Sequence, residues 1–241
     1  MEEYINITLD KIDQEHICCA ISDKKHFEGV FNKKEWLKKR ITEGHVFRKL
    51  NVQGKVFVEY APLEKAWVPI EGSGFLYIYC LWVSGKFKGQ SYGKQLLEYV
   101  INDAKKKGKQ GVCVISSKKK KSYLADKKFF LKYGFEVVDQ IEDYELLSLS
   151  FNHQKPFFCK SVKQMMIDSN HITIYYSPQC PFTLNCIHEI KEYIKDCNIQ
   201  VDFIKIDTLE KAKNIPCIFN NWAVFKNGKY VSHILLNIKR F

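Results

Sequence analysis

The sequence predicts an α/β (α+β) fold: a mixed sheet flanked by helices, followed by a small second domain of βαβ-ββ order. The first observation is an apolar run at 75–83, whose aromatic and β-branched residues are typical of a buried strand. The second is an amphipathic helix after it, with apolar residues at helical spacing: Leu96, Leu97, Val100, Ile101 and Ala104. The third is that the pattern restarts near residues 151–156 and, after a linking segment at 161–168, strand–helix alternation begins again, which indicates a second domain.

The other elements of the first domain follow from the same two periodicities. Strands are expected at 16–21, 46–50, 56–60, 111–115 and within 135–150, and helices at 24–43 and 123–133. The strands at 46–50 and 56–60 are close enough to form a hairpin around Gly54. Because short turns favour antiparallel pairing and helical crossovers require parallel pairing, the sheet is expected to be mixed.

The second domain is predicted to begin with a strand at 172–176. The segment 177–183 then opens a helix with Ile187, Ile190 and Ile194 on one face. A strand at 201–206 and a hairpin at 223–231, turned at Asn-Gly, complete the unit.

Composition favours a cytoplasmic protein. The chain has 241 residues, of which 46% are hydrophobic, enough for two domains with cores of their own. No apolar run reaches the roughly 18 residues of a membrane span, and the first residues lack the pattern of a signal peptide. The nine cysteines are scattered without framework spacing, which favours reduced thiols, and no C-x-x-C pair indicates a metal site.

The formal charge of +11 raises the question of nucleic acid binding. The densest basic stretches are 105–107 and 118–121, and runs of this kind are usually solvated loops or helix ends. No helix-turn-helix, zinc-finger or RNP pattern accompanies them. We therefore expect no nucleic-acid partner, and attraction of a phosphate-bearing cofactor remains as an alternative role for these lysines.

The turn between the central strand and its helix has the composition of a pyrophosphate site. A helix N-terminus presents unused backbone N–H groups at the positive end of the helix dipole, and glycines let the backbone approach a ligand. Lysines add positive charge on both sides of the turn. The candidate cofactor-binding residues of the turn are Lys88, Gly89, Gln90, Ser91, Tyr92, Gly93 and Lys94.

This turn resembles motif A of the GNAT family of N-acetyltransferases, written Q/R-x-x-G-x-G/A. Lys88 takes the first position, Ser91 the first glycine and Gly93 the second, so two positions depart from the pattern. The resemblance implies acetyl-CoA (CoA) as cofactor, with its pyrophosphate held by the turn. It also implies that the backbone of Leu81, Trp82 and Val83 faces the acetyl carbonyl.

The segment 129–135 resembles motif B of the same family, where a tyrosine commonly protonates the departing thiolate. Phe130 stands at that position and cannot donate a proton. Tyr123 is the candidate substitute, and packing or a CoA contact is the alternative role for it. The family's direct attack by an amine also needs a proton acceptor, and Glu59, on the strand beside the central one, is our candidate. An exposed strand glutamate is the competing interpretation.

The second domain resembles the thioredoxin/glutaredoxin fold and the YoaP-like domain found behind GNAT domains. The implied division is a GNAT domain at 1–155 and a YoaP-like, thioredoxin-like domain at 168–241. In the thioredoxin family a cis-proline lies against the active cysteine, which would make Pro216 that proline. Cys180, where a helix is expected to begin, and Cys217 are then candidate reactive thiols.

The most favoured function is therefore acetyl-CoA-dependent transfer of acetyl to a primary amine, of a small molecule or a peptide. Two alternatives stay open: a thiol-redox protein, and a CoA-binding regulatory protein without acetyl transfer. We expect no membrane partner, and a homodimer is left open.

Overall fold

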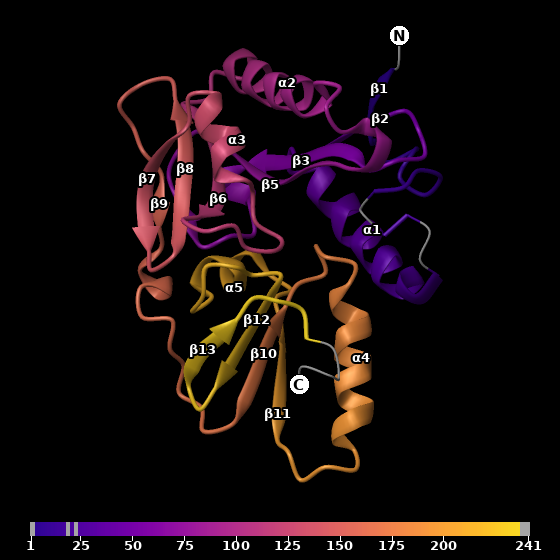
Figure 1. Ribbon diagram of the computed structural model, residues 1–241, viewed down its shortest axis with the longest axis vertical. Coiled ribbons are helices and arrows are strands. Elements are labelled where there is room, and N and C mark those ends of the chain that lie inside the picture. The colour runs from indigo at the N-terminus through magenta and orange to yellow at the C-terminus, as the bar shows by residue number, and fades with distance from the viewer. Residues whose placement is uncertain (1–2, 18–19, 22–23, 237–241) are drawn as a thin grey trace. The chain divides into compact units, whose positions relative to one another are not determined.

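The computed structural model describes residues 3–17, 20–21 and 24–236, and in it the chain divides into two compact units (Figure 1). The first unit combines Met1–Ile21, Lys38–Ala66 and Ile70–Phe158. The second combines Ser22–Leu37, Trp67–Pro69 and Cys159–Phe241. Within the described residues, no helix is both long enough and apolar enough to cross a membrane.

A seven-stranded mixed sheet forms the first unit, in the order β1-β2-β3-β5-β6-β8-β7. Its strands are β1 (Tyr4–Asn6), β2 (Val46–Leu50), β3 (Val56–Pro62), β5 (Phe75–Val83), β6 (Gly111–Ser117), β7 (Glu136–Ile141) and β8 (Tyr144–Ser150). Neighbours pair antiparallel except β5 and β6, which are parallel because α2 connects them. The predicted mixed sheet and the hairpin of β2 and β3 are confirmed.

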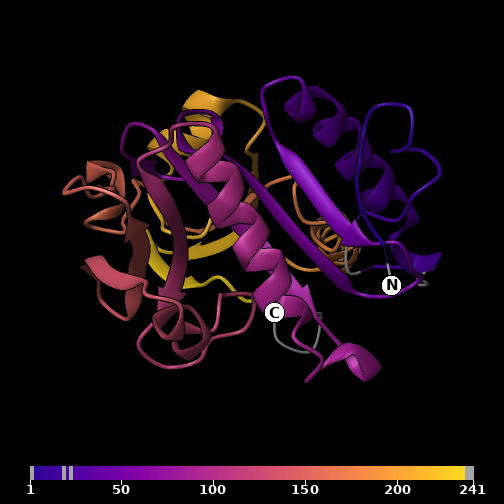
Figure 2. The same cartoon turned by 90° about the horizontal axis from the view of Figure 1, so that it is seen from above.

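Helix α2 (Tyr92–Lys106) covers one face of this sheet, as Figure 2 shows for the helix in magenta. Leu96, Leu97 and Val100 have no exposed surface and pack on strand residues such as Val58 and Ile78. The helix forms because its apolar residues recur at three- and four-residue spacing and find this apolar sheet face. The predicted core positions of the helix are confirmed, with Ile101 partly buried at the edge of the core.

The central strand β5 breaks its pairing on both sides near its middle. On the β3 side, Glu59 pairs with Cys80 and Tyr60 with Ile78, so Tyr79 is the extra residue of a β-bulge. On the β6 side, parallel pairing covers only Phe75 to Tyr77. Strands β5 and β6 therefore separate over the second half of β5.

Two predictions for the first unit are wrong. The strand expected at 16–21 is not formed by the described residues 16, 17, 20 and 21, while 18–19 lie outside the described residues. Instead, β1 occupies the edge of the sheet beside β2. The helix expected at 123–133 is the shorter α3 (Lys127–Lys132), because the Asp126 side chain caps it by accepting from the Phe129 backbone.

The remaining elements of the first unit are short. Strands β4 (Ile70–Glu71) and β9 (Phe157–Phe158) pair antiparallel as a separate two-stranded sheet. The 3₁₀ helices η2 (Leu63–Lys65) and η3 (Gly85–Phe87) precede β4 and α2, respectively. The helix predicted at 24–43 is η1 (Lys24–His26) followed by α1 (Phe27–Ile41), and the division into units falls within α1.

The second unit contains a four-stranded sheet in the order β11-β10-β12-β13. The elements are β10 (Ile172–Tyr176), α4 (Thr183–Ile194), β11 (Val201–Lys205), α5 (Leu209–Asn214), β12 (Trp222–Lys226) and β13 (Lys229–Ser232), with the short η4 (Lys160–Val162) before them. Strand β10 is parallel to β11 and antiparallel to β12, and the predicted Asn-Gly turn joins β12 to β13. Ile187 and Ile190 of α4 pack on the sheet beside Trp222.

The expected cis-proline is absent from the described residues, since none of their peptide bonds is cis. Pro216 lies six residues before β12, in the segment between α5 and that strand. Helix α5, which no pattern predicted, ends only two residues before Pro216 and begins with a Thr208 cap. The proline thus follows a helix end instead of immediately preceding a strand.

The start of α1 packs within the second unit against the turn that precedes α4. Lys25 forms a 2.5 Å ion pair with Glu189, and the rings of His26 and Phe182 meet edge to face at 4.6 Å. A Cβ atom at Gly29 would overlap the carbonyl oxygen of Pro181, so this position accepts only glycine. The second unit therefore includes part of the first 155 residues, beyond the segment 168–241.

Gly111 opens β6 in close contact with β8 and β5, and we expect Gly111→Ala to destabilise the first unit. The added Cβ would overlap the Leu149 carbonyl oxygen and lie 2.8 Å from the Phe75 ring. Overpacking of this kind costs about 1–3 kcal/mol. Urea unfolding followed by circular dichroism measures the loss.

Gly93→Ala is the matched control, because its Cβ would meet nothing closer than 3.5 Å and a helical alanine is favoured over glycine. Equal stability of the Gly111→Ala protein and the wild type would contradict the packing described for β6.

Candidate functional site

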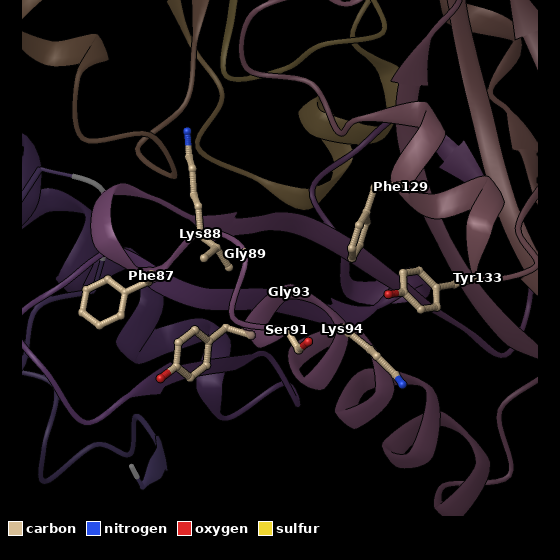
Figure 3. A pocket seen from close by; sticks show the side chains of 10 residues that line it. Phe87, Lys88, Gly89, Ser91, Gly93, Lys94, Phe129 and Tyr133 are labelled. Atoms are coloured by element: carbon tan, nitrogen blue, oxygen red, sulfur yellow. The ribbon is translucent and has the colours of Figure 1, made fainter. Parts of the chain in front are cut away.

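A cavity of about 250 Å³ opens at the N-terminus of α2 (Figure 3). Four parts of the chain form it: the end of β5, the turn that leads into α2, the first residues of α2, and α3 with the residue after it. Its lining residues are Val83, Phe87, Lys88, Gly89, Ser91, Tyr92, Gly93, Lys94, Phe129 and Tyr133. All of them belong to the first unit.

The turn into α2 has a backbone shape that most residues avoid. Gly89 has a φ of +79°, and Ser91, the N-cap of α2, has a φ of +62° without a capping hydrogen bond from its side chain. The left-handed conformation costs a non-glycine residue about 1–2 kcal/mol. The first N–H groups of α2 have no acceptor inside the helix, and the residues that carry them, Tyr92, Gly93 and Lys94, line the cavity. The floor of the cavity is therefore suited to an anion.

Two lysines give the cavity its positive charge. Lys88 and Lys94 both line it, and Figure 3 shows their side chains leaving the turn in different directions. Lys94 is 3.6 Å from Glu98 in an ion pair whose two side chains are half exposed. Exposed ion pairs are weak, so Lys94 can still bind an anion. An anion bound at the helix N-terminus would meet a cation on either side.

An aromatic wall closes the other side of the cavity. The Phe129 ring lies 3.5 Å from where a Cβ of Gly93 would be, and it packs against Tyr133 with ring centroids 5.0 Å apart. In Figure 3 the Tyr133 hydroxyl points into the cavity. Phe87, Phe129 and Tyr133 were missed from the sequence. The available signal was that Phe129 and Tyr133 are four residues apart and so share a helix face.

Most of the predicted cofactor-binding residues come together in this cavity. Seven of the ten line it: Val83, Lys88, Gly89, Ser91, Tyr92, Gly93 and Lys94. Leu81, Trp82 and Gln90 are not among its lining residues. The Gln90 side chain instead donates to the Lys86 carbonyl at 2.6 Å, and Trp82 is 46% exposed further along β5.

Glu59 lies at the bulge of β5 and is fully buried. Its register partner on β5 is Cys80, next to the bulge residue Tyr79. His45 Nε2 lies 3.1 Å from Glu59 Oε1, and the His45 ring stacks on Tyr79 with centroids 5.0 Å apart. The alternative of an exposed strand glutamate is therefore wrong. His45 was missed because it lies 14 residues away, in the turn before β2.

The comparisons with known proteins agree with this geometry. The family model described as "Acetyltransferase (GNAT) domain" matches residues 51–137, which span the bulge, the cavity and α3. The model described as "YoaP-like" matches residues 200–241. Over 241 residues, the chain is 42% identical to the N-acetyltransferase YoaP of Bacillus subtilis (strain 168), covering 99% of this chain and 96% of that protein. The chain belongs to the GNAT family of N-acetyltransferases.

Solved structures of GNAT proteins are similar to the first part of the chain. The PaiA N-acetyltransferase of Thermoplasma acidophilum, solved with coenzyme A, is 16% identical, and the match covers 63% of this chain and 99% of that one, with a TM-score of 0.44. A GNAT acetyltransferase of Brucella melitensis, solved with acetyl-CoA, is 15% identical over 66% of this chain and 93% of that one, with a TM-score of 0.42.

Tyr123, the predicted substitute for the motif B tyrosine of the GNAT family, is not on α3. It lies in the loop before that helix, is 51% exposed and has a φ of +67°. The expectation that Tyr123 belongs to a helix at 123–133 is therefore wrong. Phe130 itself is 2% exposed and packs edge to face on Phe135, as a core residue does.

The two candidate thiols of the second unit differ in environment. Cys180 is partly exposed in the turn before α4, where its carbonyl accepts from the Thr183 hydroxyl at 3.0 Å. Cys217 has no exposed surface, and burial raises the pKa of its thiol far above the usual value, so it stays protonated. Burial also raises the pKa of Cys186 in α4 to about 11. The environment of Cys217 does not favour the role of a reactive thiol.

The left-handed turn predicts opposite effects of two exchanges on stability. Ser91→Gly should raise the free energy of unfolding by up to about 1 kcal/mol, because glycine tolerates this φ and no capping bond is lost. Gly89→Ala should lower it by about 1 kcal/mol through φ alone, since a Cβ there would meet nothing within 4 Å. Urea unfolding measures both, and changes of equal sign would argue against the turn as described.

Proposed function

We propose that this N-acetyltransferase takes its acetyl group from acetyl-CoA and transfers it to a primary amine by direct attack. The observation that carries the proposal is the cavity at the N-terminus of α2, with its N–H groups, its two lysines and its aromatic wall. Each feature matches one part of the cofactor. The helix N-terminus and lysines suit a diphosphate, and the apolar wall suits the less polar arm attached to it.

The residues of the cavity fit this group well. The backbone of 89–94 would hold the diphosphate, with Lys88 and Lys94 as counter-charges, and Phe129 would cover the arm beside Val83. When bound, acetyl-CoA would supply the acetyl group as an activated thioester. The chain's own residues have three tasks: they bind and orient the donor, they polarise the acetyl carbonyl and they take up a proton from the amine.

The separation of β5 from β6 supports the assignment of the second task to β5. Beyond Tyr77, the backbone of β5 has left its ladder with β6. The backbone of Leu81, Trp82 and Val83 lies on this stretch, at the end that leads to the cavity. Its N–H groups are the proposed donors to the carbonyl oxygen. Glu59, beside the bulge, is the proposed proton acceptor, whereas the exposure of Tyr123 gives no support to a role as acid.

The second unit is proposed to be a thioredoxin-like domain. Its sheet order, β11-β10-β12-β13 with only β10 and β11 parallel, supports that fold. We propose 1–155 as the acetyltransferase domain and 168–241 as the YoaP-like domain, with the start of α1 contributed to the second unit. The protonated, buried Cys217 gives the thiol-redox alternative no support.

Acetyl transfer can be tested directly on the full chain. Purified protein is incubated with acetyl-CoA and four amine classes: a polyamine, an aminoglycoside, a lysine-containing peptide and a peptide with an alanine N-terminus. Mass spectrometry should detect an acetyl adduct on the amine of one class at least. Binding of acetyl-CoA without any adduct would favour the regulatory alternative instead.

Gly93→Asp should weaken CoA binding by at least about tenfold, since a carboxylate would stand in the cavity among groups that favour anions. Isothermal titration calorimetry with CoA measures the loss. Gly93→Ala is the control: its Cβ reaches only ordinary contact distance from Phe129, so it should bind CoA within a few-fold of the wild type. Unchanged affinity in a folded Gly93→Asp protein would remove the cavity as the CoA site.

A further inference from the structure

A buried acid–imidazole pair lies beside the bulge of β5. The Glu59 side chain is 0% exposed and the His45 side chain 2%, and 3.1 Å separates Oε1 of Glu59 from Nε2 of His45. Burial disfavours the charged form of an isolated carboxylate, which would then be unable to accept a proton. A hydrogen-bonded imidazole offsets this cost. The pair can therefore hold an ionised carboxylate inside the first unit.

Strand alternation places Glu59 on the sheet face turned away from α2. Its neighbours Val58 and Tyr60 belong to the core that α2 covers, and the Tyr60 hydroxyl donates to Asp103 of α2 at 2.8 Å. Tyr79, the bulge residue, contacts His45 on the same side as Glu59. The acid, the imidazole and the bulge thus share the face opposite α2.

The pair also lies at a definite place along β5. Glu59 is in register with Cys80, which is beyond the end of the β5–β6 pairing at Tyr77 and three residues before Val83 of the cavity. Three strand residues span about 10 Å. A diphosphate held at the helix N-terminus would thus lie about one short strand segment away from the pair. In acetyl-CoA, the arm between the diphosphate and the thioester can span this distance.

We propose that His45 and Glu59 act as one proton-accepting unit for the acceptor amine, with Glu59 taking the proton through a water molecule and His45 as its positioning residue. The proposal rests on the acetyl transfer proposed above. It assigns a role to His45, which holds the carboxylate in one orientation and stabilises its ionised form. The bulge matters because it brings Tyr79 over the imidazole ring and fixes the ring in place.

The protons balance without a further reactant. An alkylammonium acceptor must release one proton before its nitrogen can attack, and this proton goes to the His45–Glu59 unit. When the N–C bond forms and the C–S bond of the thioester breaks, the nitrogen releases a second proton, which the thiolate takes. The unit then returns its proton to solvent. One proton per turnover therefore leaves the protein.

Aromatic side chains of β5 pack beside the pair. On β5, Tyr79 stacks on His45 and Tyr77 meets Tyr79 edge to face at 5.0 Å. Burial raises the pKa of Tyr77, so it stays neutral across the working range. Arg40, near the end of α1, forms a 2.8 Å ion pair with Glu43. The backbone N–H of His45 donates to the Arg40 carbonyl.

The test is the pH profile of kcat/KM for the amine that the wild type acetylates fastest in the panel of four. In Glu59→Gln, kcat/KM at pH 7.5 should fall by about 10²–10⁴-fold, as expected for loss of a general base. It should then recover about tenfold per pH unit up to the pKa of that amine, about 10 for a lysine side chain and about 8 for a peptide N-terminus, because solvent must deprotonate the amine instead. Glutamine keeps the shape of the side chain and can still accept from His45.

His45→Gln should lower kcat more than it raises KM, because the imidazole acts on the carboxylate and not on the bound substrate. Asp202→Asn is the matched control. It removes the charge from a second His–carboxylate contact, His171 to Asp202 at 2.6 Å in the second unit, and should leave the profile unchanged. Thermal unfolding of each variant separates a loss of fold from a loss of proton transfer.

A second readout needs no turnover. The histidine ring signals of the full chain are titrated by NMR, and the His45 signal is identified by its loss in His45→Gln. Glu59→Gln should shift the midpoint of the His45 titration downward, since a cation beside a carboxylate is stabilised and one beside an amide is not. If His45→Gln does not fold, the pH profile of Glu59→Gln still decides the proposal.

The outcomes are distinguishable. A wild type that acetylates none of the four amines would overturn the proposed function and, with it, this role. A wild type that turns over while Glu59→Gln keeps its pH profile, or an unshifted His45 titration in that variant, would overturn the proton-accepting unit alone. The pair would then be a structural element of the first unit.

Discussion

The separation of β5 from β6 is the constraint on which the rest of the first unit depends. Parallel strands normally continue their ladder, but this one stops at Tyr77 while both strands extend further. The bulge at Tyr79 bends β5 at the same level, since an extra residue on one strand increases its local twist. Backbone groups that a continuous sheet would have consumed are thereby left for another partner.

Helix α2 forms a binding site beside this separation because its apolar face packs on the sheet while its N-terminus lies at the end of β5. Its apolar face fixes it on the sheet through Leu96, Leu97 and Val100, all fully buried. That packing determines where its N-terminus lies, at the end of β5, and the left-handed Ser91 determines how the chain enters it. The core thus positions a helix end whose N–H groups carry the function, and the strain at Ser91 is the local cost of that entry.

The sequence predicted those features of the structure that residues close together along the chain determine. The bounds of β5, the face of α2 and most of the cavity follow from periodicity and from the turn 86–94, because neighbouring residues along the chain decide them. The surroundings of Glu59 could not be predicted from the sequence. His45 comes from the turn before β2, and Tyr79 contacts His45 only because of the bulge. A bulge shifts the strand alternation by one residue, and no pattern in a single strand reveals it.

The motif B segment matches the residue pattern of the family, but its tyrosine stands at a different position. The pattern places Phe130 where a tyrosine is expected, and the structure buries that ring against Phe135. The tyrosine of this segment that lines the cavity is Tyr133, one turn later, and its hydroxyl points inward (Figure 3). Helix α3 begins only at Lys127, after the Asp126 cap, so the loop residue Tyr123 has no helical spacing with either. Side-chain position here follows from where the helix is capped, and the cap is a single carboxylate accepting one N–H.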